Sequence, residues 1–274
     1  MEEFCLRLLM FALVTCHFTL SEIVSAESNS SSTRHRSVSS VLSCPAPEPC
    51  GCERSPGKLI LNCRHHGLYE VPTFSQSEEL VDELTLASNR LVALPNYAFR
   101  GLRVRRLDLE ENNLRSISAA AFSGLEAHLE ELRIQLDRTA EFPSKALASL
   151  TLLRVLSVIN YGHASLPSSA LSSFSQLYEL RLTSGTLQAL LPSDVAPIRT
   201  SVSVVDLSGN PLRGVPSATL ATLSNLTEVF LSGCQIFHLS SRAFAFNWTG
   251  LRRIDLSSNQ LEVWIFRHVM FREV

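Results

Sequence analysis

The chain has 274 residues, of which 45% are hydrophobic and 18% are charged, and its formal net charge at pH 7 is −2. With 24 Lys and Arg against 26 Asp and Glu, the composition argues against a nucleic-acid-binding protein and against a polybasic membrane-surface protein. The length is sufficient for a sizeable core in one or two domains.

Residues 1–26 have the pattern of a secretory signal peptide. An apolar run at residues 8–20 is followed by the small residues Val24, Ser25 and Ala26. The alternative is an uncleaved signal anchor, but the run is short for a bilayer. No other stretch is long and apolar enough to span a membrane. The sequence therefore predicts a secreted, extracellular protein with no membrane span.

Residues 27–43 (ESNSSSTRHRSVSSVLS) are rich in serine and nearly free of large apolar groups. Such a segment cannot bury enough apolar surface to offset the entropy of ordering, so we expect a flexible leader. Asn29 begins a glycosylation sequon within it.

Residues 44–72 contain four cysteines, Cys44, Cys50, Cys52 and Cys63. In an exported chain, four cysteines favour two disulfides. Cys50 and Cys52 are too close for easy bridge geometry, which disfavours pairing them and leaves two other connectivities open. A zinc site that also uses His65 and His66 is the alternative, but the spacing fits no standard zinc motif. We therefore expect no metal.

From residue 73 to residue 274 one eleven-residue pattern recurs. Its clearest copy is VRRLDLEENNL at residues 104–114, which has the leucine-rich repeat signature of one short strand and one turn per repeat. The second consensus leucine recurs eight times, 23 to 25 residues apart, at Leu84, Leu107, Leu132, Leu156, Leu180, Val205, Val229 and Ile254. Each unit buries its apolar face only against its neighbours. The sequence predicts an α/β leucine-rich repeat solenoid with a parallel sheet of about eight strands.

One position of each repeat is polar instead of apolar. A buried amide needs hydrogen-bond partners, so we expect the asparagines there to bind backbone groups of adjacent turns. Cys234 stands at this position in the seventh repeat, where a buried structural thiol is expected. The predicted structural polar ladder is Asn89, Asn112, Asn210, Cys234 and Asn259.

The segment CPAPEPCGCERSPGKLILNCRHHGLYEVP, followed by the repeats, resembles extracellular leucine-rich repeat proteins with an N-terminal cysteine cap. The run GLEAHLEELRI…FPSKALASLTLLRVL is loosely similar to arthropod chaoptin-like proteins and to the non-catalytic leucine-rich subunit of Oplophorus luciferase. The resemblance implies the disulfides Cys44–Cys52 and Cys50–Cys63, a horseshoe with a concave parallel sheet, and binding without catalysis. Relatives usually end in a second cysteine cap, and nothing after Leu261 provides one. We expect either a fragment or a partner that covers that end.

Charged residues alternate in sign across neighbouring predicted strands. Arg105 and Arg106 are expected to lie between the acidic pairs Asp82/Glu83 and Glu130/Glu131. The arginine cluster that also includes Arg100 and Arg103 can be interpreted as a polyanion site, but a solvated ladder of ion pairs is the favoured interpretation.

The pattern departs from the consensus between residues 129 and 187, where Asp137, Tyr161 and Gly185 take the polar position. Apolar and aromatic side chains fall on the strand side there, beside charged ones, which is typical of a protein-binding centre. The alternative is a locally irregular solenoid whose exposed apolar groups have no function. The predicted partner-binding residues are Leu136, Val155, Ile159, Tyr178, Arg181 and Phe230.

Two further sequons begin at Asn225 and Asn247, and both are expected along one rim of the last repeats. No nucleotide-binding, hydrolase or metalloprotease motif occurs, so we expect neither an enzyme nor a cofactor. The sequence predicts a secreted module that binds an extracellular protein through its concave face. The alternative is a non-catalytic, stabilising subunit of a secreted complex. The partner's identity and the oligomeric state do not follow from the sequence.

Overall fold

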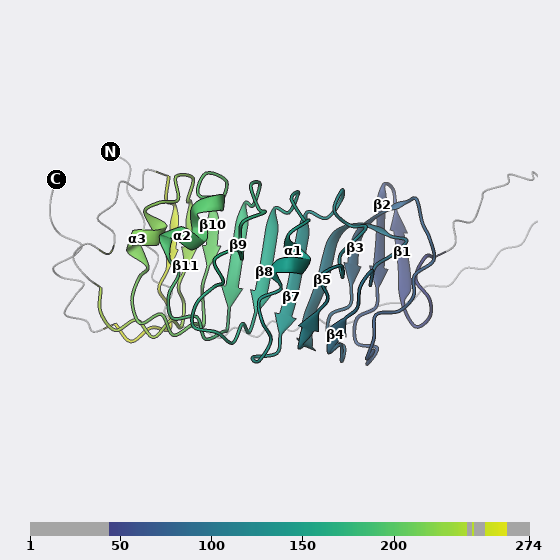
Figure 1. Cartoon of the computed structure of the whole chain (residues 1–274), viewed down its shortest axis with the longest axis horizontal. Coiled ribbons are helices and arrows are strands. Elements are labelled where there is room, and N and C mark those ends of the chain that lie inside the picture. The colour runs from purple at the N-terminus through teal and green to yellow at the C-terminus, as the bar shows by residue number, and fades with distance from the viewer. Residues whose placement is uncertain (1–43, 240–242, 244–249, 262–274) are drawn as a thin grey trace, which may run out of the picture. The chain divides into compact units, whose positions relative to one another are not determined.

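The computed structural model describes residues 44–239, 243 and 250–261 (Figure 1). The predicted signal peptide, the serine-rich leader with Asn29, and the sequon at Asn247 lie outside the described residues. In the described part of the chain, no helix is long and apolar enough to cross a membrane.

The main element of the fold is a ten-stranded sheet in which the strands follow one another in chain order (Figure 1). Its first two strands pair antiparallel, and every later neighbour pairs parallel. The strands are β1 (Gly51–Ser55), β2 (Lys58–Asn62), β3 (Leu80–Thr85), β5 (Arg103–Leu114), β7 (Glu131–Leu136), β8 (Val155–Ile159), β9 (Glu179–Thr183), β10 (Val204–Asp206), β11 (Glu228–Phe230) and β12 (Arg253–Asp255).

The connections between these strands contain only short elements. Two of them pair as a second, two-stranded sheet, β4 (Ala93–Leu94) with β6 (Ser116–Ile117). The helices are α1 (Ser144–Leu147), α2 (Pro192–Val195), the 3-10 helix η1 (Ala196–Ile198) and α3 (Ser217–Leu220). Figure 1 views the main sheet from the side on which α1, α2 and α3 lie.

One residue of each parallel strand occupies the same register, and it is the second consensus leucine. Leu84 of β3 pairs with Leu107 of β5, and the series continues without a slip to Ile254 of β12. This confirms the predicted solenoid and its eight repeat strands. Leu61 of β2 lies opposite Leu84, so the cysteine-containing segment adds one more parallel strand to those of the repeats.

The core lies between the strands and the connecting segments. Phe99 and Phe122, from two consecutive connections, are fully buried and stack with their ring centroids 6.0 Å apart. Phe174 is also fully buried, two repeats farther along. Burial of each such side chain stabilises the fold by about 1.5–3 kcal/mol. Each repeat packs on the repeats before and after it, so the buried side chains form one continuous core along the solenoid.

The first strands form the N-terminal cap, and its disulfides are Cys44–Cys52 and Cys50–Cys63. This confirms the pairing that the resemblance implied, and it occupies the four sulfur atoms that a zinc site would need. Leu59 and Leu61 of β2 are buried against β3, so the cap covers the apolar end of the first repeat.

The polar position of the repeats forms a column of buried amides. The Nδ2 group of Asn112 donates to the carbonyls of Leu86 (3.0 Å) and Leu109 (3.1 Å), and its Oδ1 accepts from the backbone N–H of Leu91 (3.0 Å). Asn89, Asn210 and Asn259 repeat this arrangement. In the seventh repeat, the Cys234 thiol donates to the carbonyl of Leu207 (3.2 Å), and burial raises the pKa of this thiol.

The turn of each repeat except the third places one residue in the left-handed backbone region. Non-glycine residues occupy it in most repeats, for example Ser88 (φ 56°) and Ser184 (φ 55°). Glycine occupies it at Gly209 (φ 73°) and Gly233 (φ 64°). We call this the left-handed position.

Candidate functional site

The solvent-facing side of the main sheet, which we call the strand face, carries ordered charges. Its N-terminal part is a ladder centred on two arginines. Arg105 lies 2.8 Å from Asp82 and 3.8 Å from Glu130, and Arg106 lies 3.6 Å from Glu83. Each exposed pair contributes about 0.2–1 kcal/mol. These ion pairs follow the alternation of charge that the sequence predicted across neighbouring strands. Both arginines therefore pair with carboxylates.

The middle of the strand face, around β8, is a crowded polar centre. Ser157 is only 3% exposed, and its hydroxyl donates to a carboxylate oxygen of Glu110 (3.4 Å), which reaches across β7 from β5. Two ion pairs, Glu131–Arg133 (2.6 Å) and Glu179–Arg181, flank β8 on its two sides. Burial raises the pKa of Glu110, and the nearby Asp108 carboxylate raises it further.

Four of the predicted partner-binding residues lie on or beside this part of the face. Val155 and Ile159 are half-buried and alternate with the buried core residues of β8. Tyr178 precedes β9 and is 45% exposed. Arg181 is exposed and forms its ion pair with Glu179.

Phe230, the fifth, lies on β11, three strands beyond β8. Its register neighbours are Asp206 and Asp255. The guanidinium of Arg253 lies over the ring, 4.8 Å from its centroid. The structure thus brings Val155, Ile159, Tyr178 and Arg181 together on neighbouring strands, and it places Phe230 farther along the same face.

The prediction for Leu136 is wrong, because this side chain is in the core and only 1% exposed. The fixed eleven-residue pattern places it on the surface, but the turn of the third repeat is shortened. Four residues separate Leu109 from Leu114, whereas one separates Ile134 from Leu136, and Leu114 pairs with Leu136. Leu136 therefore takes the core position that Leu114 holds in the second repeat.

The same shortening moves Asp137 out of the polar position. Its carboxylate accepts from Nδ2 of Asn113 (2.9 Å) and lies 3.4 Å from Arg115. Hydrogen bonds from the hydroxyl and backbone N–H of Thr139 lower the pKa of Asp137 to about 2.

Gln135 restores a hydrogen bond that the shortened turn would otherwise lose. In other repeats, the N–H of the left-handed position donates to a backbone carbonyl of the next repeat, as from Ser88 to Glu110 (3.0 Å) and from Ser184 to Ser208 (2.8 Å). At Glu111 the acceptor is instead the side-chain Oε1 of Gln135 (3.1 Å). The sequence reasoning missed this role, although a leucine two residues after Ile134 is a signal of the shorter turn.

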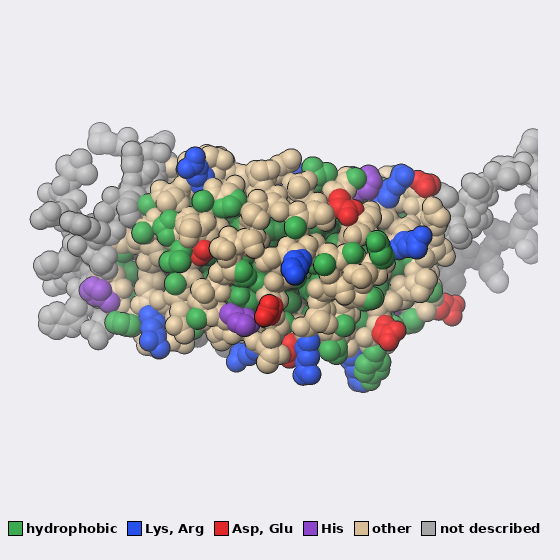
Figure 2. All heavy atoms as spheres, viewed as in Figure 1, with side chains coloured by type: hydrophobic (Ala, Val, Ile, Leu, Met, Phe, Trp, Pro, Cys, Tyr) green, Lys and Arg blue, Asp and Glu red, His purple; other side chains and the backbone are tan. Residues whose placement is uncertain are grey.

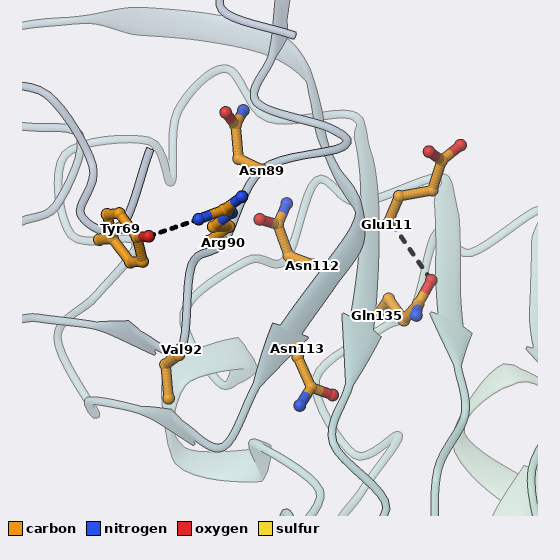
Figure 3. Close-up of a pocket in the computed structure, with 8 residues that line it drawn as sticks. All are labelled: Tyr69, Asn89, Arg90, Val92, Glu111, Asn112, Asn113 and Gln135. Atoms are coloured by element: carbon orange, nitrogen blue, oxygen red, sulfur yellow. Dashed lines mark hydrogen bonds between the residues drawn. The ribbon is translucent and has the colours of Figure 1, made fainter. Parts of the chain in front are cut away.

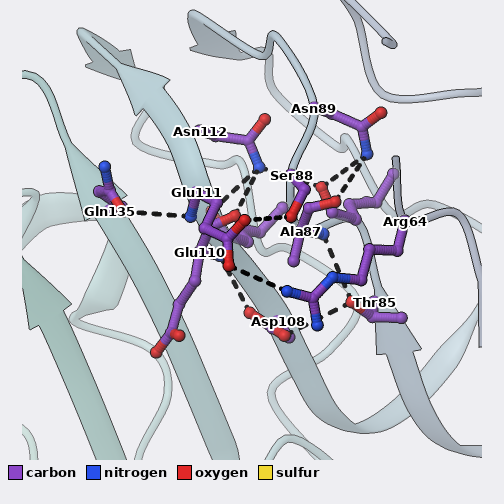
Figure 4. A network of polar contacts seen from close by, with 12 residues as sticks. Arg64, Thr85, Ala87, Ser88, Asn89, Asp108, Glu110, Glu111, Asn112 and Gln135 are labelled. Carbon is purple, nitrogen blue, oxygen red and sulfur yellow. Dashed lines mark hydrogen bonds and ion pairs between the residues drawn. The ribbon is translucent and has the colours of Figure 1, made fainter. Parts of the chain in front are cut away.

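A second polar network joins the cap to the second repeat (Figure 4). Arg64, which follows β2, lies 2.9 Å from the Glu111 carboxylate, and the hydroxyl of Ser88 donates to the same carboxylate. The hydrogen bond from Ser88 is the main cause of a lowered pKa at Glu111, and Arg64 adds to it. No sequence pattern relates Arg64 to Glu111, which are 47 positions apart.

An open hollow of about 630 Å³ lies beside this network, at the turns that follow the strands (Figure 3). Tyr69 stands at its edge with 65% of its surface exposed. The Arg90 guanidinium lies 5.5 Å from the Tyr69 ring centroid and donates to the Tyr69 hydroxyl (2.5 Å). The residues that line the hollow are Tyr69, Asn89, Arg90, Val92, Glu111, Asn112, Asn113 and Gln135.

The rim at which the strands begin contains the predicted glycosylation residue Asn225. Asn225 is exposed, immediately precedes Leu226, and donates to the carbonyl of Thr200 (2.6 Å). On the face over which the short helices lie, charged side chains are scattered among hydrophobic and uncharged ones, without a large cluster of one sign (Figure 2).

Residues 79–135 match the family model described as leucine rich repeat. Similar curated proteins include Leucine-rich repeat-containing protein 3 of Bos taurus, 34% identical over 111 residues that make up 40% of this chain and 42% of that protein. Toll-like receptor 8 of Homo sapiens is 26% identical over 229 residues, which are 77% of this chain and 21% of the receptor.

Among solved structures, the TLR13–ssRNA13 complex is similar, with a TM-score of 0.57 and 26% identity over 67% of this chain and 25% of that one. The chain spans less than half the length of each of these relatives. The repeat register, the match over residues 79–135 and the structural neighbour agree. The described part of the chain is a leucine-rich repeat solenoid with a disulfide-linked cap before its first repeat.

Proposed function

We propose that this chain is a secreted binding module that recognises an extracellular protein through the strand face. The leucine-rich repeat fold is typical of protein–protein interaction modules, because stacked repeats present one long continuous surface. The disulfides of the cap are consistent with an oxidising, extracellular location. The predicted signal peptide at residues 1–26 supports the same location.

The observation that carries the proposal is the mixture of side chains between β8 and β11. Tyr178 is 45% exposed, and Phe230 lies beneath the Arg253 guanidinium. Tyrosine and arginine are enriched among the residues that dominate protein interfaces. Because the Arg253 guanidinium already restricts the Phe230 ring, this side chain loses little conformational entropy when a partner binds. Val155 and Ile159 add half-buried apolar surface to this centre.

A protein partner fits the charges better than a nucleic acid does. The solved relative is a complex with ssRNA13, but that chain is about four times longer than the part this chain covers. Here three of the strand-face arginines, Arg105, Arg133 and Arg181, each pair with a carboxylate. A nucleic acid would need unpaired basic groups along its phosphates.

The remaining features of the proposal follow the sequence. The domain limits are 1–26 for the signal peptide, 27–43 for the leader, 44–72 for the cap and 73–274 for the repeats. Glycans at Asn29, Asn225 and Asn247 would shield the leader and one rim, which leaves the strand face accessible. The module needs no cofactor and catalyses no reaction. The looser resemblance to chaoptin-like proteins and to the luciferase subunit stays a prediction.

The test begins with partner capture. The secreted chain, purified and immobilised, is used to capture and identify proteins from the fluid into which the source tissue secretes. The captured protein is then measured against variants Val155→Asp, Ile159→Asp and Phe230→Asp. Leu191→Asp is the matched control, because Leu191 is 51% exposed and lies at the start of α2, away from the strand face.

We expect at least a tenfold loss of affinity in the three strand-face variants and none in the control. Full binding by folded strand-face variants would refute this site. Recovery of the chain in a fixed stoichiometric complex would instead indicate the stabilising-subunit alternative.

A further inference from the structure

The hollow at the turns has a structural cause that is independent of the strand face. The turns after β3 and β5 are full length, and the turn after β7 is the shortened one. On the side of the third repeat, the turn of the second repeat therefore has only a shorter turn beside it. This leaves an open space beside Arg90 and Asn113, and Gln135 forms its wall on the side of the third repeat (Figure 3).

Two of the amides that line the hollow are already fully used by the backbone. Asn89 and Asn112 both donate and accept within the polar ladder. Glu111 is engaged by Arg64 and Ser88, and its carboxylate points away from Gln135 in Figure 3. These groups form the wall of the hollow and have little capacity left for a ligand.

Three other groups retain hydrogen-bonding capacity. Among the described residues, the ion pairs do not include Arg90, whose guanidinium is held by the Tyr69 ring and hydroxyl. Gln135 uses Oε1 for Glu111, and its Nε2 has no partner in the described part of the chain. Asn113 uses Nδ2 for Asp137, which leaves its Oδ1 as an acceptor. The hollow thus offers one cation, one amide donor and one amide acceptor.

The apolar part of the hollow is a ring face and a small aliphatic side chain. Tyr69 is 65% exposed and Val92 is 44% exposed, and Arg90 holds the ring in place. A flat exposed ring suits a ligand with its own flat C–H face. It does not form the deep pocket that an apolar anchor side chain of a peptide fills.

We propose that this hollow binds an acidic saccharide, with its carboxylate on Arg90 and its C–H face on the Tyr69 ring. Sugar hydroxyls both donate and accept, so they match the Asn113 carbonyl and the Gln135 amide together. An acidic peptide would also place a carboxylate on Arg90 and backbone groups on these two amides, but its side chains do not present the flat C–H face that a sugar ring lays on the exposed Tyr69 ring. Arg90 and Gln135 lie two repeats apart, about 10 Å, which a disaccharide unit can bridge.

The test uses sialyllactose as the probe and lactose as its neutral counterpart, measured by calorimetry or ligand-detected NMR on the secreted full chain. We expect saturable binding of sialyllactose and at least tenfold weaker binding of lactose. Arg90→Ala should weaken sialyllactose binding at least tenfold, and Tyr69→Ala severalfold. Arg154→Ala is the control, because Arg154 is an exposed arginine on the other rim and should leave binding unchanged.

Four outcomes would overturn the proposal. One is no binding of sialyllactose by the folded chain. The second is equal binding of lactose, and the third is unchanged binding in the Arg90→Ala variant. The last is binding of an acetylated tetraglutamate peptide as tight as that of sialyllactose, which would assign the hollow to an acidic peptide. Circular dichroism of each variant distinguishes lost folding from lost binding, and Arg90→Lys tests the charge with the least change of shape.

Discussion

The side-chain carbonyl of Gln135 accepts the backbone N–H of Glu111 at 3.1 Å, where other repeats use a backbone carbonyl. A single side chain thereby replaces part of a turn, and the hydrogen bonds between successive turns continue across the irregular third repeat. It also forms one wall of the hollow.

Removal of this side chain should destabilise the fold. Gln135→Ala leaves the Glu111 N–H without its partner, at a cost of about 1 kcal/mol. Gln135→Glu keeps an acceptor at the same place and should lose less. Urea unfolding of both variants measures the difference, with Gln176→Ala, an exposed glutamine on the other rim, as the control. Equal losses in the two Gln135 variants would show that the acceptor is unimportant.

The position of Leu136 predicts a large stability effect and no direct binding effect. Because Leu136 is 1% exposed, Leu136→Ala should reduce the free energy of unfolding by about 2–5 kcal/mol. Tyr178→Ala, at an exposed position, should change it by about 0.5 kcal/mol or less. Thermal and urea unfolding check both values. A Leu136→Ala variant as stable as the parent protein would contradict the buried position of Leu136.

The consensus leucines, Leu136 and the Arg64–Glu111 contact show what the sequence could predict and what it could not. The second consensus leucines predicted the register of eight strands without error, because this side chain is buried in the first seven repeats and recurs at a nearly constant spacing. Leu136 was misplaced because a fixed-length pattern cannot detect a shortened turn. The contact between Arg64 and Glu111, 47 positions apart, depends on how three successive turns lie beside one another, and no local pattern encodes it.

The charge of Glu110 predicts a pH-dependent stability. Its folded pKa is raised above the ordinary 4.5, chiefly by burial, so the folded state holds this proton more tightly than the unfolded state does. The stability gained from the proton is complete below about pH 4.5 and is lost as the pH rises through the folded pKa. Glu110→Gln should therefore stabilise the protein at pH 7 relative to the parent, and the advantage should shrink as the pH falls toward 4.5.

Urea unfolding at a series of pH values tests this, with Glu53→Gln on the exposed strand β1 as the control. A Glu110→Gln advantage that does not change with pH would mean that the proton on Glu110 is not the cause.

The left-handed position predicts opposite effects for two neighbouring residues. Ser184 holds φ at 55°, a conformation that costs an L-residue about 1–2 kcal/mol. Glycine removes that strain, but its more flexible unfolded chain costs about 0.5–1 kcal/mol of conformational entropy on folding. Ser184→Gly should therefore raise the free energy of unfolding by about 0.5 kcal/mol. Gly209 has φ 73°, and an added Cβ would lie 3.1 Å from the Cα of Ser184. Gly209→Ala should therefore destabilise by about 1–2 kcal/mol.

Urea unfolding of Ser184→Gly, Gly209→Ala and the double variant measures these effects. In the double variant, the contact between the new Cβ and residue 184 persists because it involves the backbone, so the two changes should add. Ser184 suits this test better than Ser88, because the Ser88 hydroxyl binds Glu111 and its removal would mix two effects. Stabilisation by Gly209→Ala would contradict the left-handed geometry at this turn.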